Sequence, residues 1–316
     1  MTLKRGAAAA TFERDAFMPN PKLPLNSLPK HNLFGLDEQD YDSARVVVLP
    51  VPYDSTTSYK TGAREGPDAT INASRNMELY SHELGFDVSK MGICTMQSMA
   101  PDVSSPENMI DKIKEEVGII LDDKKIPLLL GGEHTITLGA MKAFKERNKD
   151  VSVIHFDAHA DSREELLGSR YMHATVAARA RELFGEVFQV GVRSIDADSA
   201  VKMDRTRMLF IEDIRRMGLS ETVSAIVDAT KSSVYLSIDL DVLDPSEMPS
   251  VGTPEPDGLR FFELMKIIRG IGARKELAGL DFTELCPIPG LHAPDFLSAK
   301  LAYLTLGCFL LDKGTL

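Results

Sequence analysis

The sequence is poor in cysteine, and its three cysteines are badly placed for cross-links. Cys94, Cys286 and Cys308 are odd in number, lie far apart and form no CxxC pair. This pattern argues against a disulfide framework and against a zinc site built from thiolates. It is typical of proteins in a reducing compartment, so we expect a cytoplasmic location.

Long apolar runs and an excess of positive charge are also missing. No apolar run reaches the roughly 18 residues of a membrane-spanning helix, and the apolar stretch near the N-terminus is too short for a signal peptide. The formal net charge of -11 argues against a nucleic-acid partner and favours a cationic partner or substrate. We therefore expect neither a membrane nor a nucleic acid as a partner.

Short β-branched runs alternate with helical patterns over most of the chain. We expect strands at 45–49, 126–130, 151–156, 187–192, 208–211, 234–238 and 277–282. We expect helices at 107–121, 135–147, 174–183, 221–230, 260–274 and 299–311. This alternation predicts an α/β fold, in which helices cover both faces of a parallel sheet. An irregular N-terminal arm at 1–44, which contains several prolines, should precede a single domain at 45–316.

Three of the expected strands end in charged motifs. These motifs are "GGEHT" with His134, "HFDAHAD" with Asp157, His159 and Asp161, and "SIDLDVLDP" with Asp239 and Asp241. In extended chain, side chains at every second position point the same way, roughly 7 Å apart. Sites in parallel sheets form where the carboxyl ends of the strands meet. The four carboxylates and two imidazoles should therefore converge at one edge of the sheet.

Such a cluster predicts a metal site with two ions. Burying four carboxylates together is costly unless cations compensate, and two divalent ions balance four negative charges. Because most of the donor atoms are oxygens, with one imidazole for each ion, the cluster favours Mn²⁺ over zinc. We expect two Mn²⁺ ions per chain.

The three motifs resemble the signatures of the ureohydrolases, the family of arginases and agmatinases, and the likeness is strongest to agmatinases. It extends to "PYDSTTSYKTGAREGPDAT" at 52–70, "VGTPEPDGL" at 251–259 and "LAGLDFTELCP" at 277–287. The resemblance implies a three-layer α/β/α fold with an eight-stranded, mainly parallel sheet. It also implies a homo-oligomer, either a trimer or a hexamer.

The resemblance further implies roles for the individual residues. His134 and Asp161 would bind one ion, His159 and Asp241 the other, and Asp157 and Asp239 would bridge both. Water activated between the ions would attack a guanidinium carbon and release urea and an amine. Asp161 would help to hold the tetrahedral intermediate, His173 would carry the proton to the leaving amine, and Glu284 would pair with the guanidinium.

The substrate tail is open at this point. The loop "SREELLGSRYMH" at 162–173 lacks the serine and asparagine pattern that arginases use for an amino-acid head group. Its acidic residues suit a second cationic group, so agmatine, which would yield putrescine for polyamine biosynthesis, is the expected substrate. Arg163 and Glu165 are candidate tail contacts. Aminopropylagmatine, which would yield spermidine, is the alternative, and guanidinobutyrate or formimidoylglutamate would use Arg163 and Arg170.

Two hypotheses from other classes also stay open. A non-catalytic regulatory homologue would be favoured by a lost metal ligand, but all six ligand positions hold the expected residue types. A hydrolase of acylated amines with a single zinc ion is disfavoured by the paired "DLD" and "DAHAD" motifs and by "GTPEP".

Overall fold

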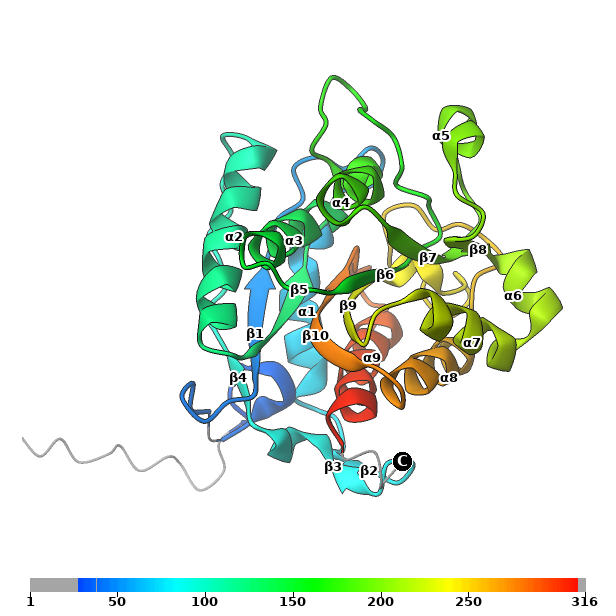
Figure 1. Ribbon diagram of the computed structural model, residues 1–316. Helices are drawn as coiled ribbons and strands as arrows, with labels where there is room; N and C mark the ends of the chain where they lie inside the picture. Colours follow the sequence, from blue (N-terminus) through cyan, green and yellow to red (C-terminus); the bar gives the residue numbers. More distant parts are fainter. Residues whose placement is uncertain (1–27, 38, 312–316) are drawn as a thin grey trace, which may run out of the picture.

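A parallel sheet of eight strands runs through the middle of the protein, whose computed structural model describes residues 28–37 and 39–311 (Figure 1). In spatial order the strands are β4 (Ile93–Thr95), β1 (Val46–Val51), β5 (Ile126–Gly131), β10 (Glu276–Thr283), β9 (Ser233–Asp239), β6 (Ser152–Phe156), β7 (Val187–Val192) and β8 (Met208–Phe210). Every neighbouring pair is parallel. All carboxyl ends therefore lie along one edge.

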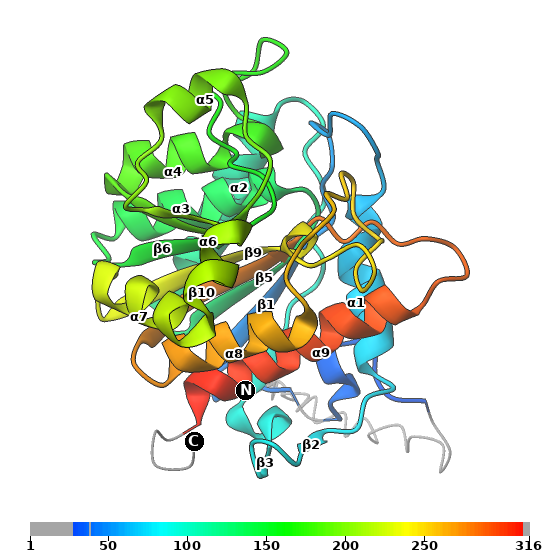
Figure 2. The same ribbon diagram turned by 90° about the vertical axis from the view of Figure 1, so that its right-hand side faces the viewer.

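Helices cover both faces of this sheet, which gives the fold three layers (Figure 2). One face carries α2 (Pro106–Asp122), α3 (Thr137–Glu146) and α4 (Val176–Phe184). The other carries α1 (Gly66–Ser74), α6 (Ile211–Met217), α7 (Leu219–Ala229), α8 (Phe261–Gly272) and α9 (Ala293–Leu310). Alternate residues of β1 show how the layers meet: Val46 and Val48 pack in one core cluster, and Val47 and Leu49 in the other. A strand buried on both faces must be apolar throughout, as β1 is.

Shorter elements complete the described chain. α5 (Ala197–Lys202) follows β7, and β2 (Tyr80–Ser81) pairs with β3 (Phe86–Asp87) as a small antiparallel hairpin. The 3₁₀ helices are η1 (Leu33–Gly35), η2 (Ala63–Glu65), η3 (Val88–Met91), η4 (His134–Ile136), η5 (His173–Thr175) and η6 (Leu240–Val242). η4, η5 and η6 carry several of the predicted site residues.

The predicted α/β fold with an eight-stranded parallel sheet is confirmed. All seven expected strands form, and the sheet gains an eighth, the edge strand β4, whose three residues are too short for a pattern to predict. α5 and α6 escaped prediction for the same reason, since neither exceeds two helical turns. α9 begins at Ala293, earlier than the expected residue 299, and its early proline is typical of a helix start.

The predicted N-terminal arm is described only from residue 28. Leu33 and Phe34 of η1 are buried, and the Phe34 ring packs edge-on against Tyr303 of α9 with 5.0 Å between ring centroids. This end of the arm therefore packs on the domain. Residues 1–27 lie outside the described residues, so the division at residue 44 stays a prediction. None of the helices in the described ranges is long and apolar enough to cross a membrane.

Candidate metal centre and its pocket

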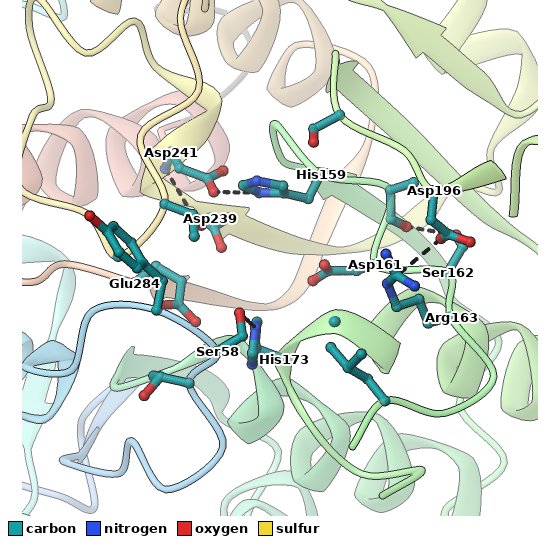
Figure 3. A pocket seen from close by; sticks show the side chains of 18 of the residues that line it. Ser58, His159, Asp161, Ser162, Arg163, His173, Asp196, Asp239, Asp241 and Glu284 are labelled. Carbon is teal, nitrogen blue, oxygen red and sulfur yellow. Dashed lines mark hydrogen bonds and ion pairs between the residues drawn. The ribbon is translucent and has the colours of Figure 1, made fainter. Parts of the chain in front are cut away.

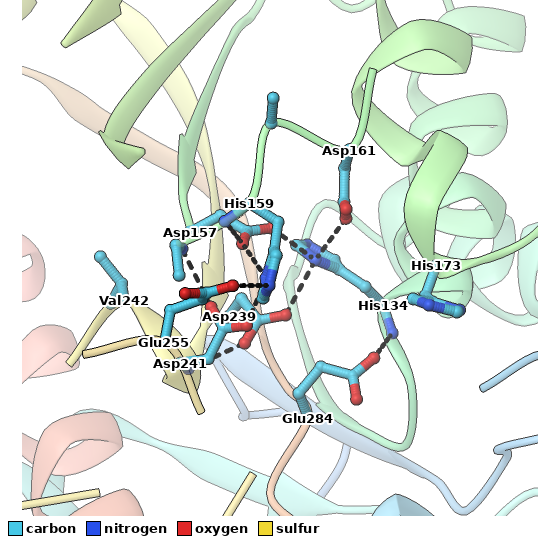
Figure 4. Close-up of polar contacts among 12 residues, drawn as sticks. His134, Asp157, His159, Asp161, His173, Asp239, Asp241, Val242, Glu255 and Glu284 are labelled. Carbon is cyan, nitrogen blue, oxygen red and sulfur yellow. Dashed lines mark hydrogen bonds and ion pairs between the residues drawn. The ribbon is translucent and has the colours of Figure 1, made fainter. Parts of the chain in front are cut away.

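The charged motifs meet at the carboxyl ends of β5, β6 and β9 (Figure 4). β6 lies beside β9, and β10 lies between β9 and β5. The turn after β5 approaches the loop after β1 closely: a Cβ on Gly132 would lie 2.0 Å from the Tyr53 carbonyl oxygen. Only glycine allows the two chain segments to approach this closely. The turn directs His134, two residues later, toward the ends of β6 and β9.

His134 lies at the bottom of the cluster and faces three carboxylates. Its Nδ1 is 3.2 Å from Asp157 Oδ2, 3.4 Å from Asp161 Oδ2 and 3.2 Å from Asp239 Oδ2. Its Nε2 lies 2.8 Å from the Ser237 hydroxyl, which fixes the ring from behind. The nitrogen that faces the carboxylates is therefore the one left for a ligand.

His159 forms the second half of the cluster. Its Nδ1 is 2.8 Å from Asp241 Oδ2 and 3.5 Å from Asp157 Oδ1, and its Nε2 is 3.7 Å from Glu255 Oε1. Asp157 thus lies between the two imidazoles. Two groups of residues bring donor atoms within 4.8 Å of one another: His134, His155, Asp157 and Asp161, and separately Asp157, His159 and Asp241. Asp157 belongs to both groups.

Backbone amides hold one oxygen of three of the carboxylates. Asp157 Oδ1 accepts from the His159 amide (2.6 Å), Asp239 Oδ1 from the Asp241 amide (2.8 Å), and Asp241 Oδ1 from the Ala158 amide (3.0 Å). The second oxygen of each turns toward a histidine nitrogen. The local chain thus presents three preset oxygen ligands, an arrangement that hard divalent ions favour.

The electrostatics of the cluster fit bound cations. His134 Nδ1 and Asp157 Oδ2 are buried, and although they lie 3.2 Å apart, neither has a partner with hydrogen-bond geometry within residues 28–37 and 39–311. Burial and the neighbouring Asp157 raise the pKa of Asp161 to about 7. Burial, Asp241 and Asp157 raise the pKa of Asp239 well above its usual range. Metal ions would satisfy the orphaned donor atoms and let the carboxylates ionise together, so this residue set fits a divalent metal centre.

The chain geometry behind this cluster differs from the expected one at Asp161. β6 ends at Phe156, and the motif after it is not extended throughout, because Asp161 adopts a φ of 44°. Strand alternation therefore explains the start of the motif but not its end. A left-handed turn brings Asp161 to His134 instead, a conformation that non-glycine residues adopt at a cost and often at functional sites.

His155 is a member of the cluster that the sequence patterns did not predict. Its ring stacks on that of His134, with 4.6 Å between centroids and 15° between planes, and its Nε2 lies 3.4 Å from Asp157 Oδ2. It sits inside the apolar run 153–156, a pattern that predicts a buried strand rather than a metal-site residue. The spacing could have indicated it: His155 precedes Asp157 by two positions, so in extended chain both side chains point to the same side.

Glu284 and His173 lie beside the cluster, as expected. Glu284 Oε1 accepts from the His134 amide at 2.6 Å, and burial together with Glu133 raises the pKa of Glu284 to about 8. His173 Nε2 lies 3.0 Å from the Ser58 hydroxyl, and burial lowers the pKa of His173 to about 4. Both residues line one cavity with Asp161, Asp239 and Asp241 (Figure 3).

That cavity, of about 280 Å³, opens between four loops, of which the loop after β9 contributes Gly252 and Thr253. The loop after β1 contributes Thr57, Ser58, Tyr59 and Lys60, the loop after β6 contributes Ser162, Arg163 and Leu166, and the loop after β7 contributes Ser194, Ile195 and Asp196. Arg163 Nε lies 3.9 Å from Asp196 Oδ2.

The predicted tail contacts differ in their positions. Glu165 lines a neighbouring hollow with Asp196 and Asp198 rather than the cavity itself. Arg170 pairs with Glu182 at 2.6 Å, away from the cavity lining. Asp196 was not predicted, although it follows the end of a strand as the other charged residues do.

Comparisons with known proteins agree with this geometry. A family model described as "Arginase family" matches residues 44–307. The chain is 38% identical to an N(1)-aminopropylagmatine ureohydrolase of Thermus thermophilus, over 90% of this chain and 97% of that protein. It is 33% identical to an agmatinase of Pyrococcus horikoshii, over 85% and 93%. The crystal structure of an agmatine ureohydrolase of Thermoplasma volcanium superposes with a TM-score of 0.81 at 32% identity, over 90% and 95% of the two chains.

Proposed function

Since the chain belongs to the arginase family and is a ureohydrolase, we propose that it hydrolyses N1-aminopropylagmatine to urea and spermidine. The observation that carries this choice is the 38% identity to a protein of that activity over 90% of the chain, compared with 33% over 85% for an agmatinase. The sequence alone favoured agmatine and gave aminopropylagmatine as the alternative. We now prefer aminopropylagmatine. Agmatine stays the second candidate, because the fold superposes closely on an agmatine ureohydrolase.

One carboxylate of the cavity, Asp196, is available to a cationic substrate tail, because the others are proposed metal ligands or the proposed partner of the guanidinium. Asp161, Asp239, Asp241 and Glu284 line the inner end of the cavity, and Asp196 lies at its mouth. An arginine-like head group would bring a carboxylate to this mouth, where Asp196 would repel it. A tail that carries amines only would be attracted by Asp196, although Lys60 and Arg163 line the same cavity.

We propose that the cluster holds two Mn²⁺ ions. The ligands would be His134, Asp157, His159, Asp161, Asp239 and Asp241, with Asp157 and Asp239 shared between the ions. When bound, such ions would supply an activated water nucleophile at neutral pH. Oxygen donors outnumber nitrogen donors in this set, which favours manganese over zinc.

The remaining residues would orient the guanidinium and move the proton. Glu284 would pair with the planar guanidinium through its carboxylate, whose Oε1 already accepts from the His134 amide. Asp161 would accept a hydrogen bond from the tetrahedral intermediate. The bond from the central carbon to the tail nitrogen then breaks, and that nitrogen needs a proton. His173, neutral at pH 7, would take the proton from the attacking water and deliver it there.

A urea-release assay with metal analysis tests this proposal. The protein is stripped with a chelator, refilled with Mn²⁺ or Zn²⁺, and assayed on aminopropylagmatine, agmatine, arginine and guanidinobutyrate. We expect two Mn²⁺ per chain and a kcat/KM for aminopropylagmatine at least about tenfold above that for agmatine, a preference of about 1.4 kcal/mol.

Other outcomes would point elsewhere. Equal or better turnover of arginine would overturn the substrate class, and one zinc per chain with hydrolysis of acylated amines would overturn the dinuclear assignment. Two bound ions without urea release would favour a regulatory homologue. The cytoplasmic location and the trimeric or hexameric assembly stay predictions, and light scattering of the purified chain tests the assembly.

A further inference from the structure

The loop after β1 is fastened to the end of β5 by a carboxylate that the mechanism above does not use. The Glu133 side chain is fully buried. Its Oε2 accepts from the Thr56 amide at 2.7 Å, and its Oε1 accepts from the Thr56 hydroxyl at 2.6 Å. The Glu133 amide donates in turn to the Tyr53 carbonyl at 2.7 Å. Within residues 28–37 and 39–311, no lysine or arginine pairs with Glu133, so these hydrogen bonds must compensate for its burial.

Thr56 also contacts His173, so that it links His173 to Glu133. The Thr56 hydroxyl oxygen accepts from the His173 amide at 3.3 Å and lies 3.2 Å from the Thr135 hydroxyl. A hydroxyl has one donor and two acceptor positions, and here all three are used: the donor by Glu133 and the acceptors by His173 and Thr135. A side chain this fully engaged has one orientation only.

Ser58, two residues further along the same loop, holds the His173 ring. Its hydroxyl lies 3.0 Å from His173 Nε2, and both residues line the cavity near Asp161 and Glu284 (Figure 3). The same loop therefore fixes both the backbone and the ring of His173, and Glu133 fixes the loop. The His173 Nδ1 atom is buried and finds no hydrogen-bond partner in the part of the chain that the structure describes.

We propose that Glu133, Thr56 and Ser58 are positioning residues that set the place and the ring orientation of His173. The inference rests on the proposed function only in taking His173 as the proton carrier. General acid catalysis requires hydrogen-bond reach between the donor and the leaving nitrogen, and a small displacement of a catalytic group lowers the rate steeply. Glu133 and Thr56 thus act on turnover through His173, since neither is among the residues that line the cavity.

Thr56→Val is the test, because it keeps the shape of the side chain and removes the hydroxyl. We expect kcat to fall by about 10- to 100-fold, as for other small displacements of catalytic groups, with KM and metal content unchanged. Thr56→Ser restores the hydroxyl and should recover most of kcat. Thr70→Val is the control for loss of a hydrogen-bonded threonine hydroxyl: Thr70 is buried, its hydroxyl lies 2.9 Å from that of Ser298, and it lies in α1 outside the cavity lining. It should keep its kcat.

A double-mutant cycle separates positioning from a general structural role. If Thr56 acts through His173, Thr56→Val should change the residual kcat of His173→Ala by less than about twofold, because the two losses share one cause. Losses that multiply would overturn the proposal, as would a Thr56→Val enzyme with unchanged kcat. Should Thr56→Val fail to fold, Ser58→Ala takes its place in the same cycle, with the same expected lack of additivity.

A readout without turnover keeps this inference separate from the proposed function. In protein labelled with ¹⁵N-histidine, the ring signals of His173 are assigned by their loss in His173→Ala. Thr56→Val should shift or broaden these signals, and Thr70→Val should not. If the wild-type chain releases no urea, the proposed function fails while this measurement still tests the attachment. Unchanged ring signals in Thr56→Val would overturn the attachment itself.

Discussion

The floor and the rim of the cavity are built in different ways. On the floor, His134, Asp157, Asp239 and Asp241 are at most 3% exposed and follow paired strands, and backbone amides bind three of the carboxylates. On the rim, Tyr59 is 68% exposed, and its neighbours Ser58 and Lys60 in the same loop are exposed as well. The floor is therefore held by the sheet, whereas the rim consists of loop segments, of which the loop after β1 is attached through Thr56 to Glu133. We infer that the floor carries the chemistry and that the rim adjusts the choice of substrate.

Asp157→Ala is the strongest test of the floor, because Asp157 lies between the two imidazoles. We expect it to abolish Mn²⁺ binding and to lower kcat/KM by more than the roughly 10³-fold that the loss of one oxyanion donor costs. Elemental analysis and the urea assay measure both. Asp150→Ala, on the surface and paired with Lys231, is the control and should change neither. Turnover by Asp157→Ala in buffer replete with metal would show that the floor is not a shared metal site.

Residues at strand ends could be predicted from the sequence more easily than residues that loops bring to the site. The six predicted ligands converge, and for all of them except Asp161 the strand pattern and the parallel topology together explain why they lie at the strand ends. Asp161 and Glu284 instead reach the site through left-handed backbone, with φ of 44° and 67°, which no periodicity indicates. The attachment of Thr56 to Glu133 joins residues 77 positions apart. Such contacts depend on the packed loops, and a local pattern cannot show them.

His173→Ala removes a group at the border between floor and rim, and its effect should be smaller. The loss of a general acid typically lowers kcat by about 10²- to 10⁴-fold, and both ions should stay bound because His173 is not among the proposed ligands. Steady-state kinetics and elemental analysis on one preparation measure this. Loss of metal in His173→Ala would place His173 on the floor as a ligand and would break the distinction drawn here.

The pH dependence of stability sharpens the position of His173 further. Burial lowers its pKa from 6.5 to about 4, so the unfolded chain binds a proton between these values and the folded chain does not. Stability from this group is therefore complete above pH 6.5 and is lost as pH falls toward 4, by at most about 1.4 kcal/mol per pH unit. In urea unfolding of the chelator-treated protein, wild type should lose more stability than His173→Ala between pH 7 and pH 5. An equal loss in both proteins would contradict the burial of His173.

The smallest expected effects lie on the rim, where two acidic residues can be compared directly. Asp196 lines the cavity and is mostly buried, whereas Glu165 is exposed and lines only the neighbouring hollow. We expect Asp196→Asn to raise KM for aminopropylagmatine by about three- to tenfold, as for the loss of a charged hydrogen bond, with kcat little changed. Glu165→Gln should change KM by less than about twofold, because an exposed charge contributes little.

The choice of amide variants keeps this comparison clean, because each removes charge and leaves the side-chain size nearly unchanged. Asn at 196 still caps α5, where the Asp196 carboxylate now accepts from the Ser199 amide at 3.0 Å. A larger effect at Glu165 than at Asp196 would show that the tail leaves the cavity and occupies the neighbouring hollow. In that case the residues that select the substrate would include those of the neighbouring hollow. The Arg163 and Asp196 pair would then not be the main determinant of selectivity.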